Sequence, residues 1–185
     1  SEVERVIEEI RKLLEDAKRH SDEVIKTDED ILRKVKKHSE EVIREIEKLL
    51  EEIEELARRR GGRDKEVVER LREVVRRAEE LVKDNKRRSE RVVEESRELV
   101  ERNRRRSEKL VRRLEELVRR LSRDVDEELL RRLEKLVEDV MRTLKKLNDE
   151  IRKSVDETEK TLEELNRRIR KTVEEVRKTA EDLVR

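Results

Sequence analysis

Apolar residues recur along the N-terminal third of the chain with the spacing of one face of an α-helix. The pattern maps onto itself after a fixed shift, as Ile7, Ile25 and Ile43 show (25 − 7 = 43 − 25 = 18). Eighteen residues make about five turns at 3.6 residues per turn, so the apolar face runs straight along the helix axis. A heptad repeat would instead impose a left-handed supercoil, and an 11-residue repeat a right-handed one. The pattern therefore predicts long helices that pack with little twist.

The repeat continues through two further segments, and two breaks separate the three. At the first break we expect Gly61 and Gly62 to end the helix, because glycine readily adopts the left-handed conformation of a helix C-terminus. Asp64 follows as the expected N-cap of the second helix. The repeat is carried by Val74, Val92 and Leu110 in the second segment and by Leu133, Ile151 and Ile169 in the third.

The second break, between residues 121 and 126, contains neither Gly nor Pro. Beyond it the apolar positions lie one residue later than the phase of the second helix predicts, at Leu129 instead of Glu128. One residue corresponds to about 100° around the helix axis, so the pattern favours a break over a bulge. Asp124 and Glu127 have the spacing of a capping box, which predicts Asp124 as the N-cap of the third helix.

Each helix presents an apolar face of roughly 120–140°, which suits packing against two neighbours. That width leaves little apolar surface for a fourth helix or for an oligomer. We therefore predict an all-α fold, an antiparallel and nearly untwisted three-helix bundle with helices of about 58 residues. The expected helices cover residues 2–60, 64–121 and 125–184 within one domain that spans residues 1–185.

Polar residues interrupt the apolar faces in two sets that are related by the same shift. Short turns near residues 62 and 123 place residue i of the first helix near 124 − i of the second and near i + 123 of the third. This register predicts two copies of one buried His–Asn–Thr–Ser arrangement. One copy comprises His20, Ser21, Asn103, Ser107, Thr143 and Asn148, and the other comprises His38, Ser39, Asn85, Ser89, Thr161 and Asn166.

Asp28 lies at the centre of the apolar face, where the repeat has isoleucine one unit earlier and one unit later. The same register places Asp28 near Ser96 and Ser154, with Thr158 one turn away. A buried polar group without a partner costs ~1–3 kcal/mol, so such layers are tolerated only when they are hydrogen-bonded. A satisfied network penalises helix orders and registers that would separate its members. These layers are therefore predicted to specify which helix lies where.

The composition is unusual for a folded domain of 185 residues: 57% of the residues are charged, 31% are hydrophobic, and Phe, Tyr, Trp, Pro and Cys are missing. Such a composition is typical of disorder, but the regular periodicity and the abundance of good helix formers indicate long helices. With a formal net charge of +1, the chain as a whole has no strong electrostatic field that would attract nucleic acid or a membrane surface. No segment has the length of a membrane span or the core of a signal peptide, so we expect a soluble protein without a targeting signal.

The repeat phase shared by all three segments, the duplicated polar set, outer faces of Glu, Lys and Arg, and the Gly61-Gly62 turn resemble de novo designed helical bundles with installed hydrogen-bond networks. The resemblance covers the whole chain and implies a hyperstable scaffold or a test of network-encoded specificity. Related designs are heterodimers or cages from which a partner displaces a helix, and others bury histidines so that acid disassembles them. The resemblance transfers no catalytic residue.

Three single features could also indicate metal binding, catalysis or nucleic-acid binding, but the sequence supports each of these roles less well than a structural one. His20 and His38 lie about 27 Å apart along one helix, far beyond the reach of a shared metal ion, so we predict no metal and no cofactor. Asp28 could act as an acid or a base, but a uniform bundle supplies no evident pocket or nucleophile. The basic run Arg102–Arg106 could attract phosphate, but glutamates interrupt the charge around it and the chain lacks aromatic side chains for base stacking.

We therefore predict a non-enzymatic scaffold, a monomer that requires no partner, nucleic acid or membrane. Two alternatives stay open. A helix-accepting interaction module, such as a cage or one half of a heterodimer, would leave an apolar groove for a designed helical partner. A pH-responsive bundle would lose stability when His20 and His38 are protonated in a dry environment.

Overall fold

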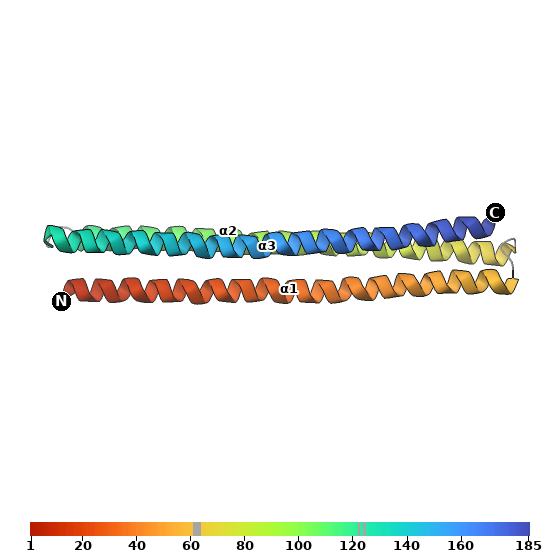
Figure 1. Cartoon of the computed structure of the whole chain (residues 1–185), viewed down its shortest axis with the longest axis horizontal. Coiled ribbons are helices and arrows are strands. Elements are labelled where there is room, and N and C mark those ends of the chain that lie inside the picture. Colours follow the sequence, from red (N-terminus) through yellow and green to blue (C-terminus); the bar gives the residue numbers. More distant parts are fainter. Residues whose placement is uncertain (61–63, 122, 124) are drawn as a thin grey trace. The chain divides into compact units, whose positions relative to one another are not determined.

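The computed structural model describes residues 1–60, 64–121, 123 and 125–185. Three helices account for nearly all of them: α1 (Glu2–Arg60), α2 (Lys65–Leu121) and α3 (Glu127–Val184) (Figure 1). The described part of the chain contains no strand. The predicted all-α three-helix fold is therefore confirmed. The predicted turn at Gly61 and Gly62 lies outside the described residues.

The starts of α2 and α3 are capped by aspartates. The Oδ1 atom of Asp64 accepts a hydrogen bond from the amide of Glu66 at 3.0 Å, which confirms Asp64 as the N-cap of α2. Asp126 caps α3 in the same way, because its Oδ1 accepts from the amide of Leu129 at 2.8 Å. The third helix thus begins at Glu127, slightly later than expected. Asp124, the predicted cap, lies outside the described residues.

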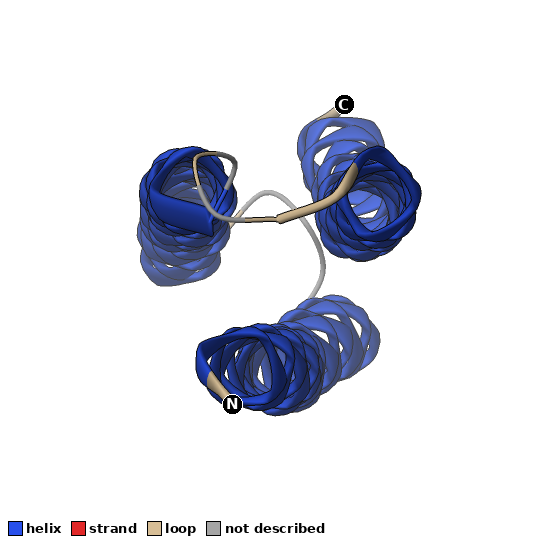
Figure 2. Cartoon of the chain, turned by 90° about the vertical axis from the view of Figure 1, so that its left-hand side faces the viewer, coloured by secondary structure: helices blue, strands red, loops and turns tan. Residues whose placement is uncertain are grey.

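The chain forms two compact units, each built from segments of all three helices. Unit 1 comprises Ser1–Glu29 and Glu95–Glu157, and unit 2 comprises Asp30–Glu94 and Thr158–Arg185. In the end view of Figure 2, the three helix segments of unit 1 nearest the viewer lie at the corners of a triangle. The buried apolar core of unit 1 consists of Val6, Ile10, Ala17, Leu114, Leu117, Leu121, Leu133, Val140 and Leu144.

Unit 2 has a larger apolar cluster and a smaller one. The larger, which we call the end cluster, consists of Val42, Ile43, Ile46, Ile53, Val67, Leu71, Val74, Ala78, Leu81, Ile169, Val173, Val176 and Ala180. The smaller one consists of Val35, Val92 and Leu162. Because a helix buries only the stripe that faces its neighbours, apolar side chains at the predicted periodicity supply these cores from all three helices.

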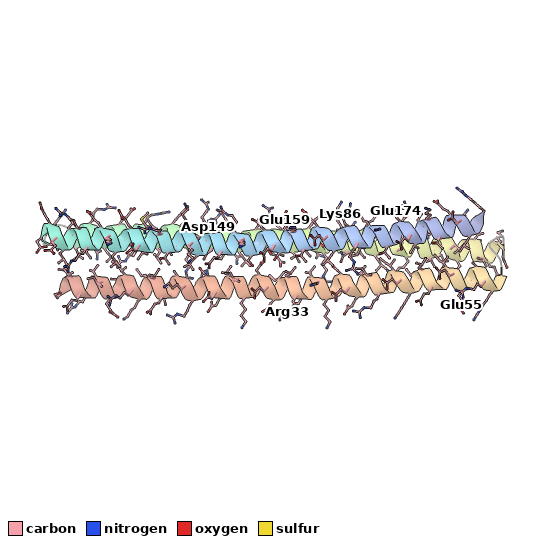
Figure 3. The ribbon with its side chains drawn as sticks, in the orientation of Figure 1. Arg33, Glu55, Lys86, Asp149, Glu159 and Glu174 are labelled. Carbon is pink, nitrogen blue, oxygen red and sulfur yellow. The ribbon has the colours of Figure 1, made fainter. Side chains whose placement is uncertain are left out.

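Partner positions within each unit show that α1 and α2 are antiparallel. In unit 2, Glu52 pairs with Arg70 and Glu45 with Arg77, so residue numbers rise along α1 as they fall along α2. These inter-helix ion pairs are half-exposed and each contributes little stability, but they favour one orientation of the helices. Other charged side chains, such as Arg33 and Glu55, point away from the neighbouring helices (Figure 3). None of the described helices combines the length and the apolarity that crossing a membrane would require.

Candidate functional site

The most deeply buried charged side chain of the described residues is Asp28, on α1 in unit 1, with 1% of its surface exposed. The hydroxyl of Ser96 on α2 donates to Asp28 Oδ1 at 2.8 Å. The hydroxyl of Ser154 on α3 donates to Asp28 Oδ2 at 2.9 Å. Each carboxylate oxygen thus binds a different helix. The Asp28 layer therefore joins all three helices of unit 1 through one side chain.

The chain places these groups together by the same phase that builds the apolar core. Asp28 stands one repeat after Ile10 and one repeat before Ile46, and both isoleucines are fully buried. An isolated carboxylate in this position would be strongly unfavourable, because burial removes its hydration. Each oxygen of Asp28 instead accepts a hydrogen bond from a serine hydroxyl, and these two bonds offset part of that cost. In this structure, both serines thus satisfy a carboxyl group that is buried at a core position.

Unit 2 contains a second polar layer, which we call the Asn85 layer. Ser39 on α1 donates from its hydroxyl to Asn85 Oδ1 on α2 at 3.2 Å. Asn85 in turn donates from Nδ2 to Asn166 Oδ1 on α3 at 2.7 Å. Ser89 lies at 3.5 Å from the same Asn166 oxygen. Asn85 is therefore the central member of a chain of hydrogen bonds across three helices.

Unit 1 holds the corresponding Asn103 layer, displaced by one repeat on each helix. Asn103 Nδ2 donates to Asn148 Oδ1, and the hydroxyl of Ser107 lies 3.4 Å from that oxygen. Ser21, buried on α1, occupies the position that Ser39 has in the Asn85 layer. Asn103 is itself buried, whereas Asn148 is partly buried. Two copies of one asparagine-centred arrangement thus occur, one in each unit.

The two histidines lie at the edges of the helix contacts, half-buried on α1. His20 Nδ1 is 3.3 Å from a guanidinium nitrogen of Arg106, a contact in which arginine donates and the ring nitrogen accepts. The pKa of His20 lies below its ordinary value of about 6.5, mainly because partial burial removes water and also because Arg106 repels the protonated ring, while Glu23 opposes these effects. Partial burial and then Arg88 lower the pKa of His38 in the same way, against Glu41.

The threonines of the predicted set have mixed surroundings. The hydroxyl of Thr143 donates to the carbonyl of Asp139 on its own helix at 2.9 Å. Thr161, one repeat later, is partly buried on α3, and Thr158 is buried on α3 in unit 2. The polar groups of Thr143 and His20 therefore have partners outside the Asn103 layer.

Arg106 and Arg88 were not anticipated as neighbours of the histidines. The predicted register placed His20 beside Asn103 or Arg104, close to the observed partner but not at it. Arg106 lies two residues beyond the position that the register gives for the partner of His20, whereas Arg70 and Arg77, the partners of Glu52 and Glu45, lie two residues short of it. Long side chains thus reach to either side of the main-chain register, and the register alone does not indicate Arg106.

Three hollows line the seam between α2 and α3, with volumes of about 610, 560 and 640 Å³. Two of them lie in unit 2 and one in unit 1. Lys86 and Glu159, which line the hollow of about 610 Å³, lie on the side of α2 and α3 that faces away from α1 (Figure 3). Across the described ranges, no three His, Cys, Asp or Glu side chains converge in a way that could hold a metal ion.

The chain is similar in structure to a solved protein described as a "Computationally designed three helix bundle". The TM-score is 0.57 and the sequence identity 23%, over 99% of this chain and 87% of that one. Neither the protein-family models nor the curated proteins contain a match. This structural similarity shows that the two proteins share the three-helix fold.

Proposed function

We propose that this chain is a designed structural scaffold whose helix order and register are specified by its buried polar layers. Its structural neighbour is a designed three-helix bundle, and its regular repeat supports the same origin. In this proposal the chain catalyses no reaction, needs no cofactor and works as a monomer in one domain. Its function is to hold three helices in one arrangement.

The single observation that carries the proposal is the Asp28 layer. Asp28 binds Ser96 and Ser154 at once, and no other position of the repeat offers that pair. If α1 packed one repeat away against the helices of another copy, Asp28 would face Leu114 and Leu136 in one direction or Ala78 and Thr172 in the other, and the two serines would face isoleucine. A buried polar group that loses its hydrogen-bond partners costs about 1–3 kcal/mol, and more when it is charged. Displaced registers and exchanged helices are therefore strongly disfavoured.

The test removes the layer without removing the core. Asp28→Ile, Ser96→Leu and Ser154→Leu together install the residues found one repeat away at Ile10, Leu114 and Leu136. Replacing buried charged groups by apolar ones is often neutral or stabilising by about 1–4 kcal/mol. We expect the triple variant to resist guanidinium at least as well as the parent, while light scattering shows mixed oligomers and spin-label distances show more than one register.

A matched control is Ile46→Leu, which conserves volume at the same repeat position in unit 2 and should leave one monomeric species. Circular dichroism first establishes that both variants remain helical. A triple variant that stays monomeric with one set of distances would show that the layer is tolerated in the core without specifying it. The scaffold proposal would then lose its main support.

A second candidate, a module that accepts an additional helix, is favoured by the three hollows along α2 and α3. Apolar side chains such as Val82 and Val93 line one of them. An amphipathic partner helix could bury such a groove through side chains three and four positions apart. Hydrogen exchange distinguishes the candidates: an acceptor protects the facing sides of α2 and α3 weakly, whereas a closed bundle protects all three helices alike.

A further inference from the structure

The hollow of about 640 Å³ in unit 2, which we call the C-terminal hollow, differs in chemistry from the other two on the α2–α3 seam. Its apolar lining comes from Val68, Leu71, Val75, Ala180 and Val184. Val184 is 43% exposed, an unusual exposure for a large apolar side chain in this protein. The apolar surface at this end of α3 is thus open to solvent.

The residues one and two repeats away, which line the other two hollows, show how the lining of the C-terminal hollow differs from theirs. Where the C-terminal hollow has Leu71, the other two have Ser89 and Ser107. The repeat positions of Val184 are likewise asparagines, members of the two polar layers. The C-terminal hollow therefore has no polar layer beneath it, and the polar surface that it does have comes from the charged side chains of its rim.

The same comparison explains the room in this hollow. Ala180 stands at the repeat position where the other two hollows have Leu144 and Leu162. Each of the other two hollows thus has a leucine side chain where this hollow has only the methyl group of Ala180. Ala78, which faces the same end cluster from α2, is also small and fully buried. The hollow is consequently lined at this position by a shorter side chain than the repeat supplies elsewhere.

The charged rim is predominantly basic. Arg72, Arg76, Arg177 and Arg185 line the hollow together with two glutamates. Glu79 is already bound to Arg177 at 2.5 Å. Within the described ranges, no carboxylate lies within ion-pair distance of Arg72 or Arg76. Guanidinium groups bind carboxylates and other oxyanions through paired N–H donors, so these arginines are suited to an anionic head group.

We propose that the C-terminal hollow binds a single-chain amphiphile with an anionic head, a free medium-chain alkyl carboxylate. The alkyl chain would lie over Val75, Ala180 and Val184, and the carboxylate would reach Arg72 and Arg76. The volume of about 640 Å³ lies within the range of small-molecule sites, which are apolar with few polar anchors. This binding goes beyond the scaffold proposal and does not depend on it, because the hollow contains no member of the polar layers.

The experiment titrates the full chain with sodium decanoate below its critical micelle concentration, by calorimetry and by methyl chemical shifts. We expect saturable binding to one site, with shifts confined to unit 2. Decyltrimethylammonium, which has the same chain and the opposite charge, should bind at least about tenfold more weakly, since it would face the arginines. Equal binding of the cationic amphiphile would overturn the proposal.

Two variants test the floor of the hollow. Ala180→Leu restores the repeat residue and fills space for about two methylene groups, whose burial is worth roughly tenfold in affinity. Val184→Asn restores the polar residue of the other hollows at an exposed position, so the fold should be retained and binding weakened. If both variants fold and bind decanoate as tightly as the parent, the proposed site is wrong.

Two further variants test the head group. Arg76→Gln should weaken decanoate binding by about three- to fivefold, as expected for one half-solvated charge contact. Arg112→Gln is the matched control, because Arg112 holds the repeat position of Arg76 in the hollow of unit 1. Decanoate binding should be unchanged in this control, and an equal loss in both variants would indicate only non-specific attraction to a basic surface.

Discussion

Asp28 in unit 1 and Ile46 in unit 2 hold the same position of the repeat and are equally inaccessible to solvent. Ile46 lies within the end cluster, where its neighbours are apolar side chains. Asp28 is held by the hydroxyls of Ser96 and Ser154, one on each neighbouring helix. The two positions show that one position of the repeat can hold either an apolar side chain or a hydrogen-bonded carboxyl group.

The difference follows from the directionality of the interactions. Hydrophobic burial is non-directional and roughly proportional to area, so isoleucine tolerates many neighbours of suitable size. A carboxylate instead requires donors at hydrogen-bond distance and loses a large free energy without them. Apolar clusters are therefore expected to supply most of the stability, and in the scaffold proposal the polar layers distinguish between arrangements that bury similar apolar area.

The largest expected effect comes from a change at Ile46, the apolar member of this comparison. Ile46→Ala should reduce the free energy of unfolding by about 2–5 kcal/mol, because it removes buried methylene groups and leaves a cavity in the end cluster. Guanidinium titration followed by circular dichroism measures the loss. Oligomeric state and register should stay unchanged, and a new oligomer in this variant would contradict the division of roles. Met141→Ala, at an exposed position on α3, is the control that should change stability by less than about 0.5 kcal/mol.

A smaller loss of stability is expected when Asn85, the central member of the Asn85 layer, is replaced. Asn85→Ala removes the partner of both Ser39 and Asn166 and should cost about 1–3 kcal/mol. Asn103→Ala changes the corresponding residue of unit 1, where Asn148 is the partner. The Asn85 variant should lose the larger amount, because Asn85 has hydrogen-bond partners on two helices whereas Asn103 has its partner on one. Equal losses would show that the contact with Ser39 adds nothing to the strength of the Asn85 layer.

The smallest expected effect is the pH dependence at the edges of the polar layers. The pKa values of His20 and His38 are lowered in the folded chain, so the unfolded chain binds more protons near pH 6. This contribution to stability is fully present above the unfolded pKa of about 6.5 and falls as the pH drops through that value toward the folded pKa. The loss should be small, since both rings are half-exposed and next to a glutamate.

Unfolding free energies measured at intervals from pH 8 to pH 5 test this effect. The double variant His20→Gln and His38→Gln serves as the reference, and the difference between it and the parent isolates the imidazoles from the many carboxylates. Stability of the parent that rises relative to the reference as the pH falls would contradict the lowered pKa values. A loss large enough to dissociate or unfold the chain would favour the pH-responsive alternative.

Much of the fold was predictable because its periodicity is local. Helix type and helix number follow from the apolar spacing and the two breaks, and the cap at Asp64 follows from its place before α2. The start of α3 was less predictable, because Asp126, two residues after Asp124, is an equally suitable N-cap residue type. The capping bond to Leu129 shows that Asp126 is used.

The polar layers could be predicted in composition but not in every partner. Ser96 and Ser154 follow from Asp28 by register alone, since short side chains meet near the level of their own Cα atoms. His20 and Arg106 have long side chains that lean along the helix, so main-chain register misplaces their contact. Thr143 bonds to a carbonyl of its own helix, a local choice that competes with any contact between helices.

The sequence by itself determined the three helices, the straight apolar faces and the spacing of the polar residues, since each depends on residues within a few turns. Only the tertiary structure decided which hydroxyls and amides bind one another, which arginine lies against His20, and where short side chains line a hollow beside Val184. These outcomes depend on side-chain length and direction across helices. Such contacts lie far apart in the sequence, and no local pattern encodes their geometry.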